Sequence, residues 1–292
     1  MLPTPIDKIE IDGRFFYIKR DDLYDVHLSG NKFRKLHTLL QTPKEKLNKI
    51  ISYGGTQSNA MLAIAKMCFL KDWEFIYYTK PLSNVQKKHQ YGNYYEAIKL
   101  GMKHTELEQN IYKNEISNLR FSLDSKTYII DQGGASTDAQ DGLNVLADEI
   151  RSQKLSVNSL ATPSGTGTTA LFLAKNLPEY KIYTTPCIGD VEYLKNQMLA
   201  LVDILPKNLI ILEPKKKYHF AKLYPSFLEI YKRLLDAGVE FDLLYAPGMW
   251  EALLEQTDDK ILYIHSGGVS GNKSMLERYC HLRERMEQMV LS

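Results

Sequence analysis

Cysteine is scarce in this sequence, whose 292 residues include only Cys68, Cys187 and Cys280, and no two of them have CxxC spacing. Three cysteines cannot all pair with one another, so neither a disulfide framework nor a cysteine zinc site is indicated. We therefore expect free thiols in a reducing compartment and no bound metal.

Long apolar runs and an excess of one charge are also missing. No apolar run approaches the ~20 residues needed to cross a bilayer, and the N-terminus lacks the charged-then-apolar pattern of a signal peptide. The 37 Lys and Arg residues nearly balance the 35 Asp and Glu residues, which leaves a formal net charge of +2. The composition argues against nucleic acid or a membrane as a partner, and we expect a cytoplasmic protein.

One unit recurs along the chain: a short apolar run, a glycine-containing turn and then a helical period. It spans residues 48–70, 157–177 and 241–256. Strands that alternate with helices predict an α/β fold with parallel-rich sheets covered by helices on both faces. A chain of this length also favours two domains. Ligands bind such sheets at the carboxyl ends of the strands, where the glycines of this chain cluster.

The turn SGTGTTA, residues 164–170, is the strongest candidate for a phosphate site. Its glycines let backbone N–H groups approach an anion, and the helix that follows adds a favourable field. A P-loop is excluded because no Gly-Lys-Ser/Thr follows. Gly165, Gly167 and Ala170 also satisfy the G-x-G-x-x-G/A pattern of a dinucleotide site, with Asp190 downstream as a ribose ligand. A phosphate monoester, a pyrophosphate and an ordinary tight turn all remain open.

A second glycine turn, residues 54–55, leads into a predicted helix that begins with three polar residues. They are Gln57, Ser58 and Asn59. Ser and Asn are preferred helix caps, so capping explains one of them but does not need three. A cluster of donors at a helix start also suits a substrate carboxylate, and both interpretations remain open.

The segment SGNKFRKL places Lys32, Arg34 and Lys35 near the start of another predicted helix. The exposed N–H groups of a first helical turn disfavour a positive charge. The simplest interpretation is that the three cations coat a solvated face. The alternative is that one lysine has a chemical role as a neutral amine, which this position would favour.

Five segments follow one another along the chain: IKRDDLYDVHLSGNKFRKL, GGTQSNA, GNYYEAIKLGM, DQGGAS and SGTGTTA. In this order they resemble the pyridoxal-phosphate-dependent 1-aminocyclopropane-1-carboxylate deaminase and D-cysteine desulfhydrase family. The resemblance spans most of the chain. It implies the tryptophan-synthase-β-like fold, which is fold type II of these enzymes. It also implies a larger cofactor domain of residues 1–36 plus 141–292, a smaller inserted domain of residues 37–140, and a homodimer.

The resemblance further implies roles for individual residues. Lys32 matches the lysine that forms a Schiff base with pyridoxal phosphate, and Asn59 matches the asparagine that hydrogen-bonds the phenolic oxygen of the cofactor. Ser58 matches a serine beside the substrate, and Tyr245 and Tyr218 match two tyrosines that assist there. The phosphate cup matches five consecutive residues: Gly165, Thr166, Gly167, Thr168 and Thr169.

The implied activity converts a small amino acid, either 1-aminocyclopropane-1-carboxylate or a D-cysteine-like substrate, into ammonia and a 2-oxo acid. Two positions depart from the family pattern. Ala246 stands where the family has Glu or Thr facing the pyridine nitrogen, and Ala60 stands where it commonly has Gln or His. A relative that binds the cofactor with little or no turnover is therefore one alternative. A Rossmann dehydrogenase that uses an NAD-type cofactor is the other.

Overall fold

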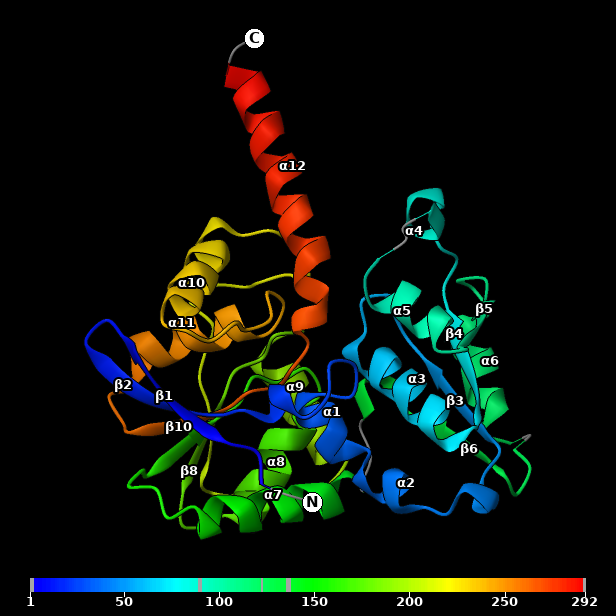
Figure 1. The fold of residues 1–292 in the computed structure, drawn as a ribbon, viewed down its shortest axis with the longest axis horizontal. Coiled ribbons are helices and arrows are strands. Elements are labelled where there is room, and N and C mark those ends of the chain that lie inside the picture. The colour runs from blue at the N-terminus through cyan, green and yellow to red at the C-terminus, as the bar shows by residue number, and fades with distance from the viewer. Residues whose placement is uncertain (1–2, 89–90, 122, 135–137, 291–292) are drawn as a thin grey trace.

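The computed structural model describes residues 3–88, 91–121, 123–134 and 138–290. These residues form two lobes, each built around one sheet (Figure 1). The six strands of the larger sheet run in the order β1 (Ile6–Ile11), β2 (Arg14–Lys19), β10 (Ile261–Ile264), β7 (Ser159–Ala161), β8 (Lys181–Thr184) and β9 (Leu209–Ile211). The smaller sheet has the order β5 (Lys103–Glu106), β4 (Glu74–Thr79), β3 (Lys49–Tyr53) and β6 (Thr127–Ile130).

The strands of both sheets pair in parallel, with the exception of the hairpin of β1 and β2. Asp12 and Gly13 connect these two strands and have φ angles of 52° and 74°. Positive φ at both central residues is what a two-residue type I′ turn requires. The predicted fold class is confirmed, since both sheets are parallel-rich and alternate with helices along the chain.

Helices cover both faces of the larger sheet. One face packs against α7 (Ala139–Ser152), α8 (Thr168–Asn176) and α9 (Val191–Leu199), and the other against α10 (Pro225–Asp236) and α11 (Ala246–Gln256). Strand β10 shows the division, because Leu262 and Ile264 join the first cluster while Ile261 and Tyr263 join the second. A strand buried on both faces reads as a continuous apolar run, which is why its sequence, ILYI, does not alternate with polar residues.

The smaller lobe has its own core. That core consists of apolar residues of the smaller sheet, of α3 (Asn59–Lys71), α5 (Asn93–Lys99) and α1 (Gly30–Lys35), and of the segment that leads into α2 (His37–Gln41). Phe33 of α1 is part of this core, so α1 packs on the smaller lobe as well as on α7 of the larger lobe, to which the predicted division at residue 36 assigns it. The strands of the smaller sheet all fall within 37–140, and the domain limits stay a prediction.

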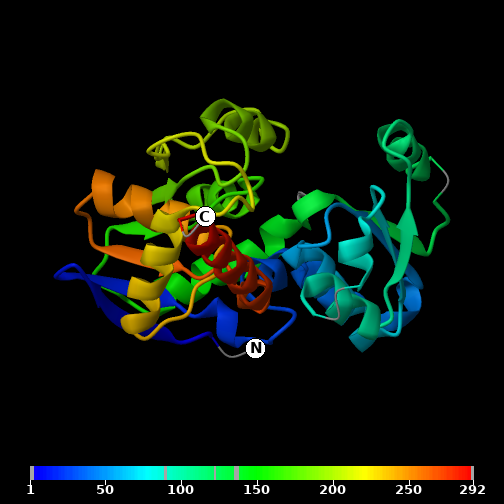
Figure 2. The same cartoon turned by 90° about the horizontal axis from the view of Figure 1, so that it is seen from above.

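The remaining elements are short, apart from the last helix. They are α4 (Asn84–Lys88), α6 (Tyr112–Leu119), and the 3₁₀ helices η1 (Asp21–Leu23), η2 (Lys44–Lys46), η3 (Gln132–Gly134) and η4 (Val269–Gly271). Helix α12 (Asn272–Val290) starts beside the smaller lobe and then extends away from both lobes (Figures 1 and 2). Within the described ranges, no helix has both the length and the apolar character to cross a membrane.

Candidate active site

A cavity of about 360 Å³ lies where the carboxyl ends of strands from both sheets meet. Its walls follow β3 at Gly55, β6 at Gln132, β7 at Ser164 and β10 at Ser266. This is the location that a parallel α/β sheet predicts for a ligand. Nine of the sequence-predicted residues line the cavity: Lys32, Ser58, Asn59, Tyr245, Gly165, Thr166, Gly167, Thr168 and Thr169.

Lys32 is the third residue of α1 and reaches the cavity with its amine. The Lys32 Nζ donates to Asn31 Oδ1 at 2.8 Å. Burial lowers the pKa of Lys32 from 10.5 to about 8, and the negative charge of Asp242 opposes this shift only in part. A lysine attacks a carbonyl carbon only as the neutral amine, and the lowered pKa increases the fraction of Lys32 in that form near neutral pH.

Gly30 determines how closely α1 approaches the cavity. It has a φ of +61°, and a Cβ atom here would lie 2.0 Å from the backbone oxygen of Ser266. The start of α1 therefore rests directly on the backbone that follows β10. Only glycine permits both this left-handed φ and this approach, so the position of Lys32 two residues later depends on it.

We expect Gly30→Ala to lower the free energy of unfolding by about 2 kcal/mol more than Gly13→Ala does, because Gly30 adds a backbone clash to the strain of a left-handed φ. Gly13 is the matched control, since it has a φ of +74° with no heavy atom within 4 Å of an added Cβ. Urea denaturation of the two variants measures the difference. Equal losses of stability would show that the contact with Ser266 relaxes freely.

Arg34 does not belong to a solvated face, which was the simplest interpretation of the three cations. Its side chain is buried between two carboxylates, with nitrogen to oxygen distances of 2.8 Å to Asp21 and 2.7 Å to Glu149. Lys19 completes the cluster at 3.0 Å from Glu149. Two cations and two anions balance in a water-excluded space and fix α1 against β2, η1 and α7.

Lys35 is a second lysine of the cavity wall, which the sequence reasoning did not place in the site. Its Nζ donates to the carbonyl of Gly133 at 3.2 Å, and burial together with the charge of Lys32 holds its pKa well below 10.5. A signal was present in the sequence, because residues three apart on a helix share a face. Gly133 in turn lies against Thr166, so Lys35 faces the glycine turn.

The turn from Ser164 to Gly167 connects β7 to α8 and lines one end of the cavity. Gly167 has a φ of +76°, and a Cβ here would lie 2.6 Å from Met198 Cγ. The hydroxyls of Thr166 and Thr168 lie 3.0 Å apart, and Asn31 Nδ2 lies 3.4 Å from Thr169 Oγ1. Hydroxyls and N–H groups at the start of α8, together with the amine of Lys35, form a site suited to a phosphate monoester.

Ser58 and Asn59 lie at the start of α3. The Ser58 Oγ accepts from the N–H of Met61 at 3.2 Å, so Ser58 is a helix cap as well as a cavity residue. Asn59 is the first residue of the helix and lies against Gly268, where a Cβ would be 2.3 Å from Asn59 Nδ2. The capping interpretation is correct for Ser58, and it leaves Asn59 available for another role.

The two predicted tyrosines have different positions. Tyr245 lines the cavity next to Gly165, and burial raises its pKa, so its hydroxyl stays protonated. Tyr218 lies in a neighbouring pocket instead, where its hydroxyl donates to Glu251 and its ring packs on Phe227 at 4.5 Å. The hydrogen bond to Glu251 holds Tyr218 in the neighbouring pocket, so Tyr218 does not line the cavity.

The two departures from the family pattern also differ in position. Ala60 lines the cavity, whereas Ala246 is buried in the first turn of α11 and outside the cavity wall. Ser266 is a further residue of the wall, and its backbone lies beside the start of α1. Asp190, the ribose ligand of the dinucleotide alternative, is the cap of α9 and accepts from Tyr193 N at 2.8 Å, so its carboxylate is already engaged.

Comparison of the structure with solved structures identifies the fold. The chain superposes on a homologue of 1-aminocyclopropane-1-carboxylate deaminase with a TM-score of 0.77 at 22% identity, covering 95% of this chain and 94% of the homologue. A fungal L-serine ammonia-lyase from Rhizomucor miehei gives a TM-score of 0.68 at 11% identity, covering 96% of this chain and 98% of that enzyme. The fold is the tryptophan-synthase-β-like fold type II of pyridoxal-phosphate enzymes.

Sequence comparison adds the relationship within that fold. No family model matches the chain. It is 25% identical to a putative 1-aminocyclopropane-1-carboxylate deaminase of Thermotoga maritima, over 92% of this chain and 95% of that protein. It is 24% identical to a mitochondrial bifunctional D-cysteine desulfhydrase/1-aminocyclopropane-1-carboxylate deaminase of Arabidopsis thaliana, over 100% of this chain and 82% of that protein. The chain resembles this family along its length, as the sequence motifs predicted.

Proposed function

We propose that the protein is a pyridoxal-phosphate-dependent deaminase or lyase that releases ammonia and a 2-oxo acid from a small amino acid, either 1-aminocyclopropane-1-carboxylate or a D-cysteine-like substrate. One observation carries the proposal. An amine with a pKa of about 8, that of Lys32, lies in the same cavity as an N–H and hydroxyl turn suited to a phosphate. The names of the relatives agree with this function and do not support the dinucleotide alternative.

The residues present fit three functional groups of the cofactor: the phosphate, the aldehyde carbon and the phenolic oxygen. The turn from Gly165 to Thr169, with Lys35 beside it, would hold the phosphate, and Lys32 would hold the aldehyde carbon. Asn59 would face the phenolic oxygen. When bound, pyridoxal phosphate withdraws electrons from the α-carbon of an amino acid and so acidifies its bonds. The cavity volume of about 360 Å³ is near the lower end for ligand pockets, which favours a small substrate.

Three side chains of the wall would act on the substrate. The neutral Lys32 amine would remove the α-proton or a neighbouring proton, as its lowered pKa allows. Ser58 would bind the substrate carboxylate at the start of α3. Tyr245 stays protonated because burial raises its pKa, so it can donate to the group that leaves or to the ring that opens.

The test is ammonia release from a panel of 1-aminocyclopropane-1-carboxylate, D-cysteine, L-cysteine, D-serine and L-serine, with and without added pyridoxal phosphate. We expect cofactor-dependent release from one of the first two compounds and the matching 2-oxo acid. Cofactor binding without release from any compound would favour the alternative of a binding protein with little turnover, for which Ala60 in the cavity wall is the supporting observation. Absence of cofactor binding would contradict both.

We expect the rate at which pyridoxal phosphate attaches covalently to the cofactor-free protein to rise with pH and to reach half its maximum near pH 8. The reason is that only neutral Lys32 reacts, and burial lowers its pKa to about 8. Stopped-flow absorbance across the pH range measures the rate. A midpoint near the ordinary lysine value of 10.5 would mean that the amine is not desolvated.

We further propose that the protein works as a homodimer in the cytoplasm. The dimer is supported by the family resemblance, and the compartment by free cysteines, of which Cys68 is buried, Cys187 partly buried and Cys280 exposed. Light scattering coupled to gel filtration would give twice the mass of one chain.

A further inference from the structure

Asn93 connects the two lobes at the edge of the proposed active site. It is the first residue of α5, comes from the GNYYEAIKLGM motif and is only 1% exposed. Ser270 of the larger lobe donates to Asn93 Oδ1 at 3.0 Å. Asn93 Nδ2 donates to the backbone carbonyl of Gln57 at 3.2 Å and to Asn59 Oδ1 at 2.7 Å.

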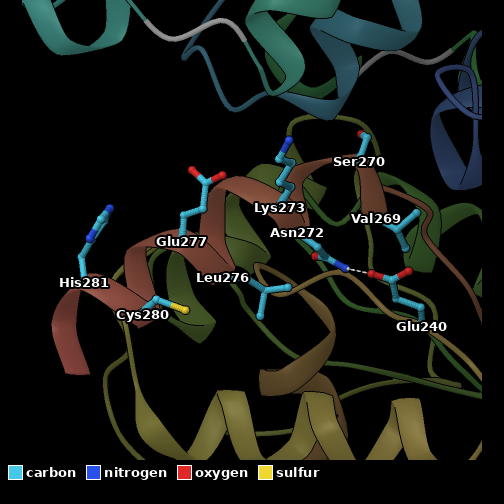
Figure 3. A pocket seen from close by; sticks show the side chains of 9 residues that line it. All are labelled: Glu240, Val269, Ser270, Asn272, Lys273, Leu276, Glu277, Cys280 and His281. Atoms are coloured by element: carbon cyan, nitrogen blue, oxygen red, sulfur yellow. Dashed lines mark hydrogen bonds between the residues drawn. The ribbon is translucent and has the colours of Figure 1, made fainter. Parts of the chain in front are cut away.

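The lobes meet at this point through a few neighbouring contacts. Figure 3 shows Ser270 and Lys273 pointing toward the ribbon of the smaller lobe, while Asn272 bonds Glu240 behind them. Lys273 Nζ lies 5.5 Å from the centre of the Tyr91 ring. Asn93 is therefore held from both lobes, and its side chain has little freedom.

The hydrogen bonds determine which way each amide faces. A backbone carbonyl only accepts, so the atom of Asn93 next to the Gln57 carbonyl must be the NH₂ group. The same NH₂ group faces Asn59, so the Asn59 atom that meets it must be the carbonyl oxygen. Asn59 therefore directs its own NH₂ group away from Asn93. Within the described part of the chain, no group accepts a hydrogen bond from Asn59 Nδ2, and Asn59 lines the cavity.

We propose that Asn93 is a positioning residue that makes Asn59 a hydrogen-bond donor toward the cavity. This inference rests on the proposed function and adds to it the reason why Asn59 suits the phenolic oxygen of pyridoxal phosphate. An NH₂ group stabilises that oxygen in its anionic form, whereas an amide oxygen would repel it. Gly268 packs tightly on Asn59 Nδ2, so the Asn59 amide has little room to tilt. When its hydrogen-bond partner changes, the amide responds by exchanging the positions of its oxygen and its NH₂ group.

The test is the absorption spectrum of the cofactor-loaded protein carrying Asn93→Asp. The carboxylate keeps the size of the side chain and can accept from Ser270, but it no longer donates. Asn59 would then turn its NH₂ group toward residue 93 and its oxygen toward the cofactor. We expect the visible band of the bound cofactor, which belongs to the anionic phenolic oxygen, to move largely to the near ultraviolet. We also expect affinity for pyridoxal phosphate to fall about tenfold.

Two comparisons make the result specific. Ser270→Ala removes one bond to Asn93 but leaves its NH₂ group on the Gln57 carbonyl, so the wild-type spectrum should remain. Asn59→Ala should reproduce the spectral change of Asn93→Asp, and the double variant should add nothing further because both changes remove one donor. Thermal unfolding of the cofactor-free proteins distinguishes a general loss of stability from a change at Asn59. A general loss would lower the unfolding temperature and leave the absorption band of the cofactor-loaded protein in place.

Each outcome decides the question. If the wild-type protein shows no cofactor band, the proposed function fails and this inference fails with it. If the wild type shows the band and Asn93→Asp keeps the same spectrum and affinity, only the role of Asn93 is overturned. If Asn93→Asp does not fold, Asn93→Ala replaces it. That variant leaves Asn59 free to face either way, so a mixture of the two bands is expected, and an unchanged spectrum would overturn the inference.

Discussion

Lys32→Ala is expected to lower ammonia release by about 10³-fold or more, because removing the lysine removes both the covalent attachment of the cofactor and the base. When it is not bound to the cofactor, Lys32 has a pKa of about 8, which permits proton transfer near neutral pH. The measurement is the turnover of the substrate identified by the panel at saturating pyridoxal phosphate. Lys113→Ala is the control, since Lys113 is exposed on α6 in the smaller lobe.

A Lys32→Ala protein that keeps more than about a tenth of the wild-type rate would contradict this assignment, because loss of a general base alone reduces rates by about 10²-fold to 10⁴-fold. Added methylamine provides a second readout. Partial recovery of the rate with an external amine would locate the defect in the missing amine and not in a disturbed α1.

Arg34→Met is expected to lower the free energy of unfolding by about 3–5 kcal/mol, since it leaves the carboxylates of Asp21 and Glu149 buried with one cation fewer. Lys19 remains beside Glu149 at 3.0 Å, so the uncompensated charge falls mainly on Asp21, which is 0% exposed. Urea denaturation measures the loss. Methionine keeps most of the buried volume, so the effect reports charge and not a cavity.

Arg151→Met is the matched control for Arg34→Met. Arg151 pairs with Glu179 at 2.8 Å, but both side chains are about 45% exposed. An exposed pair contributes about 0–1 kcal/mol, so this variant should change stability by no more than that. Similar losses in the two variants would mean that the buried cluster around Arg34 is not the feature that fixes α1.

The location of the cavity was predictable from the sequence, but part of its wall was not. The glycine turn and the helix starts follow strands, and parallel strands bring their carboxyl ends together, so Lys32, Asn59 and Thr168 meet as the resemblance implied. The position of Lys35 in the cavity wall could have been predicted, because it lies three residues after Lys32 on the same helix face. Ser266 gave no comparable signal, because its approach to Gly30 depends on how β10 packs beside β2.

The roles of Arg34 and Tyr218 could not be read from local sequence. Arg34 binds Asp21 and Glu149, which are 13 and 115 residues away, so the pattern around it looks like any basic helix face. Tyr218 aligns with a family tyrosine, but the nearby acceptor Glu251 holds it in the next pocket. The antiparallel hairpin of β1 and β2 was detectable, since Asp-Gly between alternating apolar residues is a strong hairpin signal.

Two amines of lowered pKa, those of Lys32 and Lys35, face one cavity, and the proposed active site requires that Lys32 holds the cofactor. The direct measurement is borohydride reduction of the protein loaded with pyridoxal phosphate, followed by peptide mass mapping with fragmentation that separates Lys32 from Lys35. We predict the pyridoxyl group on Lys32, because Lys35 donates to the Gly133 carbonyl and faces the phosphate turn. A pyridoxyl group on Lys35, or on no residue of α1, would contradict the proposed active site.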